Sequence, residues 1–212
     1  MSAQQATSVS VFGLGYVGAV TVACLAKAGA RVTGVDVQVA KVEAINRGVS
    51  PIVEPGLDEL VRAGHDAGLI RATTDAAEAV RATETSIVCV GTPSLGSGKV
   101  NLEFMRKVAA QIAEAVRAKQ QAHTLIFRST MPPGTTRALV EEFLGDLTTA
   151  GLLRVFYCPE FLREGSALAD YEEPSLRVLG TEDGNWPAEA PEALPVMDEL
   201  MCWEEAEMLK YA

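Results

Sequence analysis

The amino-acid sequence predicts an α/β protein in which helices cover both faces of a doubly wound, mostly parallel β-sheet. Short runs rich in β-branched residues alternate with segments of helical periodicity along most of the 212 residues, which is typical of parallel strands joined by crossover helices. The expected strands are apolar throughout, as in sheets with two buried faces. A glycine-rich turn follows the first strand, and together these observations predict a Rossmann-like architecture.

The expected elements alternate in order along the chain. The strands are Ser8–Phe12, Arg31–Val35, Ser86–Val90, Thr124–Phe127, Arg154–Tyr157 and Leu176–Leu179. The helices are Val17–Ala28, Ala40–Arg47, Leu57–Ala63, Ala76–Arg81, Leu102–Lys119 and Thr135–Leu144. Because a helix separates most consecutive strands, neighbouring strands are expected to run parallel.

The C-terminal part differs in composition. Residues 181–195 (TEDGNWPAEAPEALP) contain three prolines and four acids, which predicts a surface loop or linker. Residues 1–195 are therefore expected to form one domain that binds a dinucleotide. Helical character returns at Glu204–Ala212, so residues 196–212 are expected to begin a helix leading to a central domain absent from this sequence. Because no Gly, Asn or Pro closes this helix, a truncated part of a longer protein is expected.

The overall composition excludes several classes of protein. With 48% hydrophobic and 22% charged residues, the chain resembles an ordinary globular protein. Its net charge of −10 repels nucleic acids and anionic lipids, so neither is an expected partner. Residues 1–26 contain no Lys or Arg, and Gly13, Gly15 and Gly18 interrupt the apolar run. Neither a secretory signal nor a membrane helix is therefore expected.

Cysteine and histidine usage indicates the compartment and the absence of a metal. Four widely spaced cysteines lie mostly in apolar runs, namely Cys24, Cys89, Cys158 and Cys202. This pattern is typical of reduced, buried thiols and predicts a cytoplasmic protein. His65 and His123 lie far apart and outside any metal-binding motif, so no metal site is expected.

The first glycine-rich turn has the spacing of a dinucleotide-binding loop. Gly13, Gly15 and Gly18 form the pattern G-x-G-x-x-G between the first strand and the first helix. The first glycine permits a tight turn, the second lets a pyrophosphate approach the backbone, and the third lets helix and strand pack closely. Free N–H groups at the helix N-terminus would then bind the phosphate charge.

An acid follows at the end of the second strand. Asp36 is placed to accept hydrogen bonds from an adenosine ribose, and its charge would repel a 2′-phosphate. The sequence therefore predicts NAD as the cofactor in preference to NADP. Lys41 either lies over the adenosine or is an ordinary surface lysine of the next helix.

Three further loops follow strands at the same predicted edge of the sheet. They are VGTPS at residues 90–94, FRSTMPPGTT at residues 127–136 and YCPEFLREGSALADY at residues 157–171. Ligands of open α/β sheets bind outside the carboxyl ends of the strands. These polar, turn-forming loops are therefore expected to line one crevice.

The segment at residues 157–171 carries two acids four residues apart. On a helix the carboxylates of Glu160 and Glu164 would share a face, but acids near a helix N-terminus also suit its dipole. Lys210 is either functional or a solvated charge facing Glu207. Cys158 is interpreted as structural, because it follows a buried strand and has no activating base nearby in the sequence.

Seven ordered segments resemble the UDP-glucose/GDP-mannose 6-dehydrogenase family: FGLGYVG, GVD, SPIVEPGLDEL, CVGTPS, RSTMPPGT, PEFLREGSALADY and AEMLKYA. The resemblance runs from Ser8 to Ala212 and covers only the N-terminal half of that family. Its members oxidise the C6 hydroxyl of a nucleotide sugar to a carboxylate with two NAD+ in succession, through a thioester on a cysteine. The resemblance implies an NAD-dependent enzyme with a nucleotide-sugar substrate, which forms a homodimer at full length.

The resemblance also implies roles for individual residues. Thr130 and Glu160 match residues that position or activate water, and Lys210 matches a lysine that stabilises an oxyanion. The residues expected at the cofactor are Gly13, Gly15, Tyr16, Val17, Gly18, Asp36, Lys41, Gly91, Thr92, Pro93, Ser129, Thr130 and Glu164. The residues expected at the substrate are Glu160, Phe161, Leu162, Arg163, Glu164 and Lys210.

The chain departs from the family pattern in several places. The family's nucleophilic cysteine lies in a glycine-rich motif beyond the position of Lys210, and an asparagine is expected four residues after that lysine; this sequence contains neither. Cys158 replaces the usual asparagine before Pro-Glu. The stretch from Trp186 to Glu205 is shortened and is expected to lack a strand and a threonine-bearing turn. The chain is therefore expected to be inactive alone.

Three functions remain open. The first is the cofactor-binding half of a nucleotide-sugar 6-dehydrogenase, with GDP-mannose slightly favoured over UDP-glucose by the segments SPIVEPG and IVCVGTPS. The second is a self-sufficient NAD-binding module without turnover, which the unclosed helix expected at Glu204–Ala212 disfavours. The third is a two-electron dehydrogenase of the hydroxyacid type, whose general-base constellation is not visible in the sequence.

Overall fold

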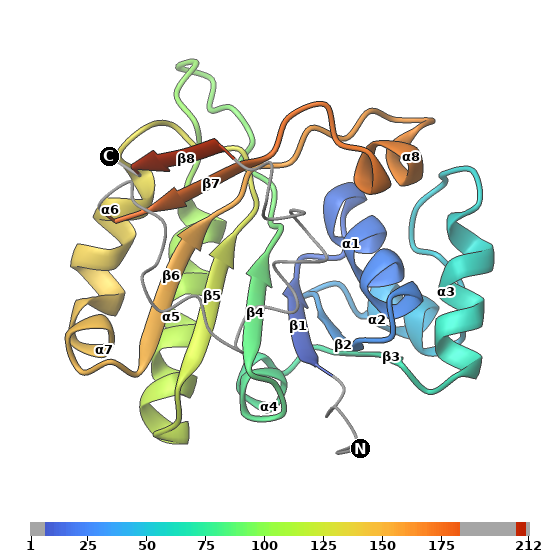
Figure 1. Ribbon diagram of the computed structural model, residues 1–212, viewed down its shortest axis with the longest axis horizontal. Helices are drawn as coiled ribbons and strands as arrows, with labels where there is room; N and C mark the ends of the chain where they lie inside the picture. The colour runs from blue at the N-terminus through green and yellow to red at the C-terminus, as the bar shows by residue number, and fades with distance from the viewer. Residues whose placement is uncertain (1–6, 183–206, 211–212) are drawn as a thin grey trace.

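The computed structural model describes residues 7–182 and, for the backbone alone, residues 207–210. The described strands form one eight-stranded sheet in the order β3-β2-β1-β4-β5-β6-β7-β8 (Figure 1). They are β1 (Ser8–Phe12), β2 (Arg31–Val35), β3 (Ile70–Thr73), β4 (Thr85–Val88), β5 (His123–Phe127), β6 (Leu153–Tyr157), β7 (Val178–Thr181) and β8 (Glu207–Lys210). Strands β1 to β6 are parallel, and only the β6–β7 pair is antiparallel within the described sheet. The predicted doubly wound, mostly parallel sheet is confirmed.

Helices cover both faces of this sheet. They are α1 (Tyr16–Lys27), α2 (Val39–Asn46), α3 (Leu57–Asp66), α4 (Ala76–Arg81), α5 (Glu103–Lys119), α6 (Thr135–Leu139), η1 (Val140–Leu144), α7 (Gly145–Thr149) and α8 (Ala167–Glu172). Helices α1, α2, α3 and α8 contribute to one hydrophobic core, whereas α4, α5, α6, η1 and α7 contribute to the other. Figure 1 shows these two groups on opposite sides of the strands.

Strand residues alternate between the two cores. Val11 packs in the core of α1, and its neighbour Phe12 packs in the core of α5. Ile126 and Phe127 divide in the same way between the two sides. All four side chains are almost fully buried. This arrangement explains why the strands are apolar at consecutive positions, since neither face of the sheet meets water.

The sequence did not predict two of the elements within residues 7–182. Strand β3 is the first strand in the sheet order and buries only alternate residues, with Arg71 exposed, so it lacks the continuous apolar run used to find the others. Helix α8 (six residues) lies almost entirely within the segment 157–171, which was predicted as a loop. The helix predicted at residues 135–144 continues through the π-helical turn η1 into α7.

The helix expected at Glu204–Ala212 is a wrong prediction where the structure describes it. Residues Glu207–Lys210 form β8, which pairs with the edge of β7 in a parallel register. An unpaired strand edge offers a row of backbone hydrogen-bonding groups, and this long-range pairing overrides a local helical preference. A strand at these residues is not the unclosed helix from which a truncated chain was expected. The rest of residues 196–212 lies outside the described part, and the boundary at residue 195 stays a prediction.

A row of buried polar side chains crosses three strands. The hydroxyl groups of Ser10 and Ser86 lie 2.8 Å apart, and Ser86 Oγ lies 2.8 Å from His123 Nε2. His123 is 3% exposed. Its burial, and to a lesser degree the charge of Lys119, lower the pKa of His123 to about 3 from an ordinary value of 6.5. The imidazole is therefore neutral throughout the physiological pH range.

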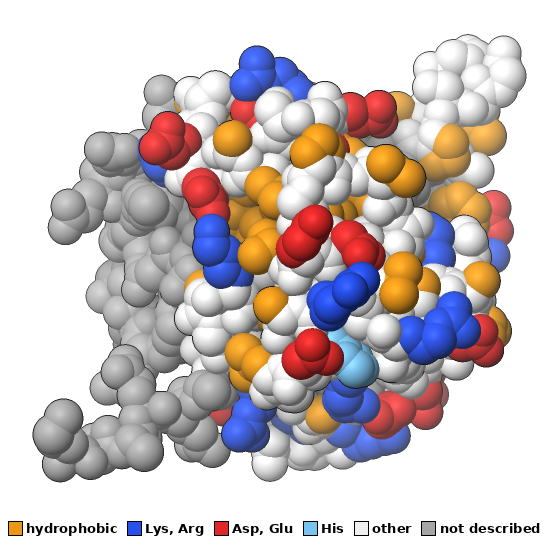
Figure 2. All heavy atoms as spheres, turned by 90° about the vertical axis from the view of Figure 1, so that its right-hand side faces the viewer, with side chains coloured by type: hydrophobic (Ala, Val, Ile, Leu, Met, Phe, Trp, Pro, Cys, Tyr) orange, Lys and Arg blue, Asp and Glu red, His pale blue; other side chains and the backbone are white. Residues whose placement is uncertain are grey.

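The described helices and one visible face were compared with two features that the sequence did not predict, a membrane-spanning helix and a basic surface for nucleic acids. Within residues 7–182, no helix is long and apolar enough to cross a membrane. Figure 2 shows the side of the molecule that carries α3 and α8, where basic and acidic side chains are interspersed. This visible face therefore lacks the extended basic surface that is typical of nucleic-acid-binding domains.

Candidate cofactor and substrate site

The turn between β1 and α1 requires glycine at two positions. Gly13 has φ of +94°, and a methyl group there would lie 2.9 Å from the Cys89 carbonyl oxygen. A methyl group at Gly18 would lie 1.7 Å from the carbonyl oxygen of Gly13. At Gly15 a methyl group would meet no atom of the described chain within 4 Å. The outer glycines thus permit close backbone packing, and the central one leaves an open approach.

Helix α1 begins at this opening without a side-chain cap. Its N-cap residue is Gly15, and no acidic residue lies in its first turn. The first intrahelical bond runs from the Ala19 amide to the Gly15 carbonyl, so the earlier amides, including those of Tyr16 and Val17, have no partner inside the helix. Such amides and the helix dipole favour a bound phosphate. The residues present therefore fit the pyrophosphate of a dinucleotide.

Asp36 lies beside the glycine turn. It is 9% exposed, and its carboxylate accepts hydrogen bonds from the amides of Leu14 (2.7 Å) and Gln38 (2.9 Å). Lys41 Nζ lies 3.6 Å from Asp36 Oδ2. The structure thus brings the acid, the lysine and the glycine turn together.

The loops after β4 and β5 are joined by two hydrogen bonds. Thr92 Oγ1 donates to the Thr130 carbonyl oxygen at 2.8 Å, and Ser129 Oγ donates to the Val90 carbonyl oxygen at 2.7 Å. Gly91 and Pro93 are exposed, as is Thr130, whereas Ser129 is buried. The five predicted residues of these loops therefore lie at the carboxyl ends of adjacent parallel strands, next to the glycine turn.

The loop after β6, hereafter the third loop, comprises residues 158–166. It is not helical, so the expectation that Glu160 and Glu164 share a helix face is wrong. Glu160 Oε2 instead accepts the Leu162 amide at 2.7 Å, and this local bond competes with helix formation. Phe161 is 40% exposed, and Glu164 is also exposed. Helix α8 begins only at Ala167.

Arg163, predicted to bind substrate, is engaged by Asp170 of α8. Its guanidinium Nη2 lies 2.6 Å from Asp170 Oδ1, and its backbone amide donates to Asp170 Oδ2 at 2.9 Å. These two hydrogen bonds, above all that of the side chain, hold the pKa of Asp170 well below its ordinary value. The Arg163 side chain remains 78% exposed, so the ion pair fixes the loop without burying the arginine.

Glu54 is a residue of this site that sequence reasoning did not single out. Its carboxylate lies between α1 and the third loop, 2.6 Å from the Tyr16 hydroxyl and 2.9 Å from the Gly165 amide. The two partners are 38 and 111 residues away in the sequence. No local pattern around SPIVEPG could have revealed them.

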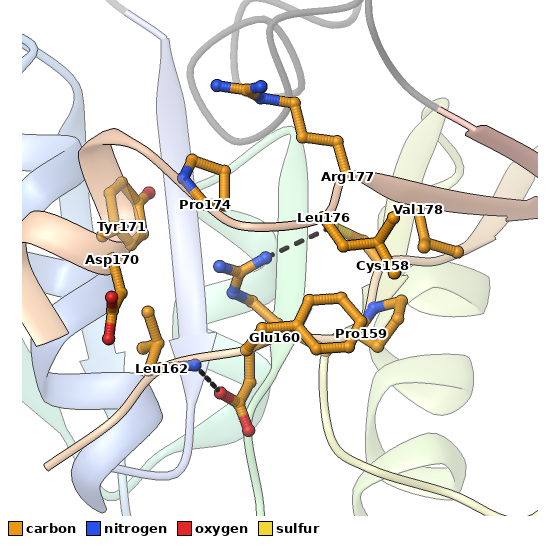
Figure 3. Close-up of a pocket in the computed structure, with 12 residues that line it drawn as sticks. Cys158, Pro159, Glu160, Leu162, Asp170, Tyr171, Pro174, Leu176, Arg177 and Val178 are labelled. Carbon is orange, nitrogen blue, oxygen red and sulfur yellow. Dashed lines mark hydrogen bonds between the residues drawn. The ribbon is translucent and has the colours of Figure 1, made fainter.

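A buried arginine lies behind the third loop. Arg128 is 5% exposed and its Nη1 donates to Cys158 Sγ at 3.2 Å, while its guanidinium lies 5.6 Å from the centre of the Tyr171 ring. Figure 3 shows Glu160 turned toward Leu162 in this region. The cavity here has a volume of about 10 Å³, which holds a single water and no sugar. This cavity is therefore too small to be the substrate site.

Two predictions about single residues have different outcomes. Cys158 is 1% exposed, as expected for a structural thiol, and the side chains of Cys24 and Cys89 are buried as well. Lys210 is the last residue of β8 and lies opposite Thr181 of β7. Its side chain, like the whole of Cys202, lies outside the described residues, so its role stays a prediction.

Comparison with known proteins identifies related sequences and folds. The profile of the UDP-glucose/GDP-mannose dehydrogenase family, NAD binding domain, matches residues 7–193. A GDP-mannose 6-dehydrogenase from Pseudomonas syringae pv. syringae is 47% identical over 178 residues, which are 82% of this chain and 41% of that protein.

Two solved structures share the fold. A ternary complex of GDP-mannose dehydrogenase from Pseudomonas aeruginosa has a TM-score of 0.78 and 43% identity, covering 82% of this chain and 40% of that chain. A UDP-glucose dehydrogenase from Pyrobaculum islandicum has a TM-score of 0.84 and 34% identity, covering 100% of this chain and 48% of that chain. The present chain therefore spans less than half the length of these relatives.

Proposed function

The chain belongs to the UDP-glucose/GDP-mannose dehydrogenase family, and we propose that it is the cofactor-binding half of a nucleotide-sugar 6-dehydrogenase. The domain that it contains is the NAD-binding domain of that family. One observation carries the proposal: the buried Asp36 carboxylate contacts the glycine turn at the point where α1 begins with uncapped amides. This arrangement suits a dinucleotide with a free ribose 2′-hydroxyl.

The cofactor contacts follow from this arrangement. The amides of Tyr16 and Val17 would bind the pyrophosphate, with Gly15 leaving room for it. Asp36 would accept the ribose hydroxyls, and Lys41 would lie at the adenosine. The nicotinamide side would be formed by the loops after β4, β5 and β6, through Gly91, Thr92, Pro93, Ser129, Thr130 and Glu164.

The reaction is the oxidation of a C6 hydroxyl to a carboxylate with two NAD+. NAD+ supplies, when bound, the acceptor for the hydride lost by the sugar. Thr130 and Glu160 would position and activate water, and Lys210 would stabilise the oxyanion. The Leu162 amide orients the Glu160 carboxylate for this task. The nucleophilic cysteine and the rest of the sugar site would belong to a further part of the protein, so turnover is not expected from residues 1–212 alone.

The proposed substrate is GDP-mannose rather than UDP-glucose. Support comes from the relatives, because a GDP-mannose 6-dehydrogenase is 47% identical and a UDP-glucose dehydrogenase 34% identical to this chain. The enzyme is proposed to act as a homodimer at full length. A purified protein extending past Ala212 should release two NADH per GDP-mannose, and the present chain should release none. Steady NADH production by the present chain, followed at the NADH absorbance, would overturn the proposal that catalysis needs the further part.

Calorimetric titration with NAD+ and NADP+ tests the cofactor assignment. We expect NAD+ to bind with micromolar-to-millimolar affinity, and Asp36→Ala to raise its dissociation constant about tenfold through lost hydrogen bonds. Asp36→Asn keeps the shape but removes the charge, so it should lose discrimination against NADP+. Thermal unfolding checks that the Leu14 contact of Asp36 is not needed for folding. Equal NAD+ affinity of wild type and Asp36→Ala would contradict the ribose assignment.

A further inference from the structure

Glu54 is a buried carboxylate that joins three distant segments. It is 8% exposed, and it precedes α3 in the segment SPIVEPG. Its Oε2 lies 2.6 Å from the Tyr16 hydroxyl and accepts the Gly165 amide at 2.9 Å. Its Oε1 accepts the Ala167 amide at 2.9 Å. Three donors occupy most of the roughly four acceptor sites of an ionised carboxylate, and both of its oxygens take part, so Glu54 ties the three donors to one another.

The donors come from α1 and from the segment that joins the third loop to α8. Tyr16 is the first residue of α1, and its own amide belongs to the uncapped turn that faces the pyrophosphate position. Gly165 and Ala167 follow Glu164 and lead into α8. The Tyr16 hydroxyl also lies 3.0 Å from the Arg163 carbonyl oxygen. Figure 1 shows α8 beside α1 and the segment that leads into α3.

The charge state of Glu54 supports a strong contact. Burial alone would raise the pKa of the Glu54 carboxyl, but the hydrogen bonds from Tyr16, Gly165 and Ala167 bring that pKa below its ordinary value. The carboxylate is therefore ionised at neutral pH, and hydrogen bonds to an ionised acceptor are stronger than neutral ones. Burial, and to a lesser degree the hydrogen bond to Glu54, raise the pKa of the Tyr16 hydroxyl. The hydroxyl therefore stays protonated and can donate.

We propose that Glu54 is a positioning residue that couples cofactor binding to the order of the third loop. A pyrophosphate bound at the first amides of α1 fixes the backbone of Tyr16. With its backbone fixed, Tyr16 restricts the position of the Glu54 carboxylate through its hydroxyl. Glu54 in turn holds the amides of Gly165 and Ala167. The third loop, with Glu160 and Glu164, is thereby held in place for the sugar. This inference rests on the proposed function, because the third loop is proposed to contact the substrate.

Hydrogen exchange of the purified chain, with and without saturating NAD+, measures this coupling. In the wild type we expect NAD+ to slow exchange in two peptides, one covering residues 13–18 and one covering residues 162–168. The first reports the bound pyrophosphate, and the second reports the third loop. Because Glu164 is itself proposed to contact the nicotinamide, protection of the second peptide in the wild type can also arise from direct contact with NAD+. The comparison with Tyr16→Phe therefore decides whether the protection depends on the contact between Tyr16 and Glu54.

Two variants distinguish the role of Glu54 in holding the third loop from its role in coupling that loop to NAD+ binding. Glu54→Gln places an NH2 group against donors, so basal exchange of the 162–168 peptide should rise about tenfold, and its response to NAD+ should disappear. Tyr16→Phe leaves both amide bonds of Glu54 intact and removes the hydroxyl that contacts Glu54 and the Arg163 carbonyl oxygen. It should keep nearly normal basal exchange in this peptide but lose most of the response to NAD+. Glu59→Gln, on the exposed surface of α3, is the matched control and should behave like the wild type.

The outcomes distinguish this inference from the proposed function. Full NAD+-dependent protection of residues 162–168 in Tyr16→Phe would overturn the coupling, even if Glu54→Gln misfolds. Misfolding is recognised by lost protection of β1. Protection of residues 13–18 without any change at residues 162–168 in the wild type would also overturn the coupling but leave NAD binding intact. No protection in either peptide would contradict the cofactor assignment, and the inference with it.

Discussion

The glycine turn after β1 and the third loop after β6 meet at the same edge of the sheet, but they are held in different ways. In the turn, Gly13 and Gly18 allow backbone atoms to approach more closely than any side chain would permit. In the third loop, carboxylates hold the backbone, because Glu54 accepts two amides and Asp170 binds Arg163. The glycine turn therefore depends on residues that have no side chain, and the third loop depends on charged side chains.

Substitution of a turn glycine should have the largest effect. In Gly18→Ala the new methyl group would lie 1.7 Å from the Gly13 carbonyl oxygen, so α1 must move away from β1. We expect a loss of about 3 kcal/mol in the free energy of unfolding and no detectable NAD+ binding. Thermal unfolding and calorimetric titration measure the two effects.

Gly15→Ala is the matched control for this variant. Its methyl group meets no atom of the described chain within 4 Å, so the free energy of unfolding should be nearly unchanged. NAD+ affinity should still fall, because the methyl group occupies the approach to the backbone. A Gly18→Ala protein as stable as Gly15→Ala would refute the view that close backbone packing holds the turn.

Acid should lower the free energy of unfolding of the whole domain through His123, which lies in neither of the two regions. Burial and the nearby Lys119 lower the pKa of His123 to about 3 from 6.5, so below pH 6.5 the unfolded chain binds a proton that the folded chain rejects. The contribution of His123 to stability is full above pH 6.5 and falls as the pH decreases toward 3, with a slope approaching about 1.4 kcal/mol per pH unit. Urea unfolding at several pH values measures this slope. In His123→Gln, which keeps a polar group near Ser86, the slope should flatten; an unchanged slope would assign the effect to other groups.

Removing the charge of Asp170 should loosen the third loop and leave the turn intact. Asp170→Asn loses the ion pair that engages Arg163, so the peptide bond after Arg163 should become open to trypsin, while NAD+ still protects residues 13–18 from exchange. Asp146→Asn is the matched control, since Asp146 pairs with Arg117 on the other side of the sheet. Equal cleavage after Arg163 in the wild type and Asp170→Asn would mean that Glu54 alone holds the loop.

The sequence predicted the glycine turn better than the third loop, and the reason is the range of the contacts. Gly13, Gly18 and Asp36 lie within one βαβ unit, so their spacing reports their geometry. The same applies to the first two strands, whose bounds match the structure. Local spacing is informative where local contacts dominate.

The third loop and the last strand depend on contacts that local patterns do not contain. Glu54 meets partners 38 and 111 residues away, so neither its burial nor its role was visible. The helix expected at Glu204–Ala212 instead contributes β8, because Glu207–Lys210 pairs with β7. The helical pairing expected for Glu160 failed for a different, local reason, since its carboxylate accepts the amide of Leu162 two residues away.

The smallest effect is expected where the two crevice loops after β4 and β5 touch. Thr92→Val removes the hydroxyl that donates to the Thr130 carbonyl oxygen at 2.8 Å, a contact near the surface worth about 0.5–1 kcal/mol. We expect the free energy of unfolding to fall by no more than this amount, and NAD+ affinity to fall about twofold, whereas Thr92→Ser should match the wild type. If Thr92→Val loses as much NAD+ affinity as Gly15→Ala, then the cofactor site depends on side-chain hydrogen bonds as well as on glycines that leave the backbone open. The division between the two regions would then be too simple.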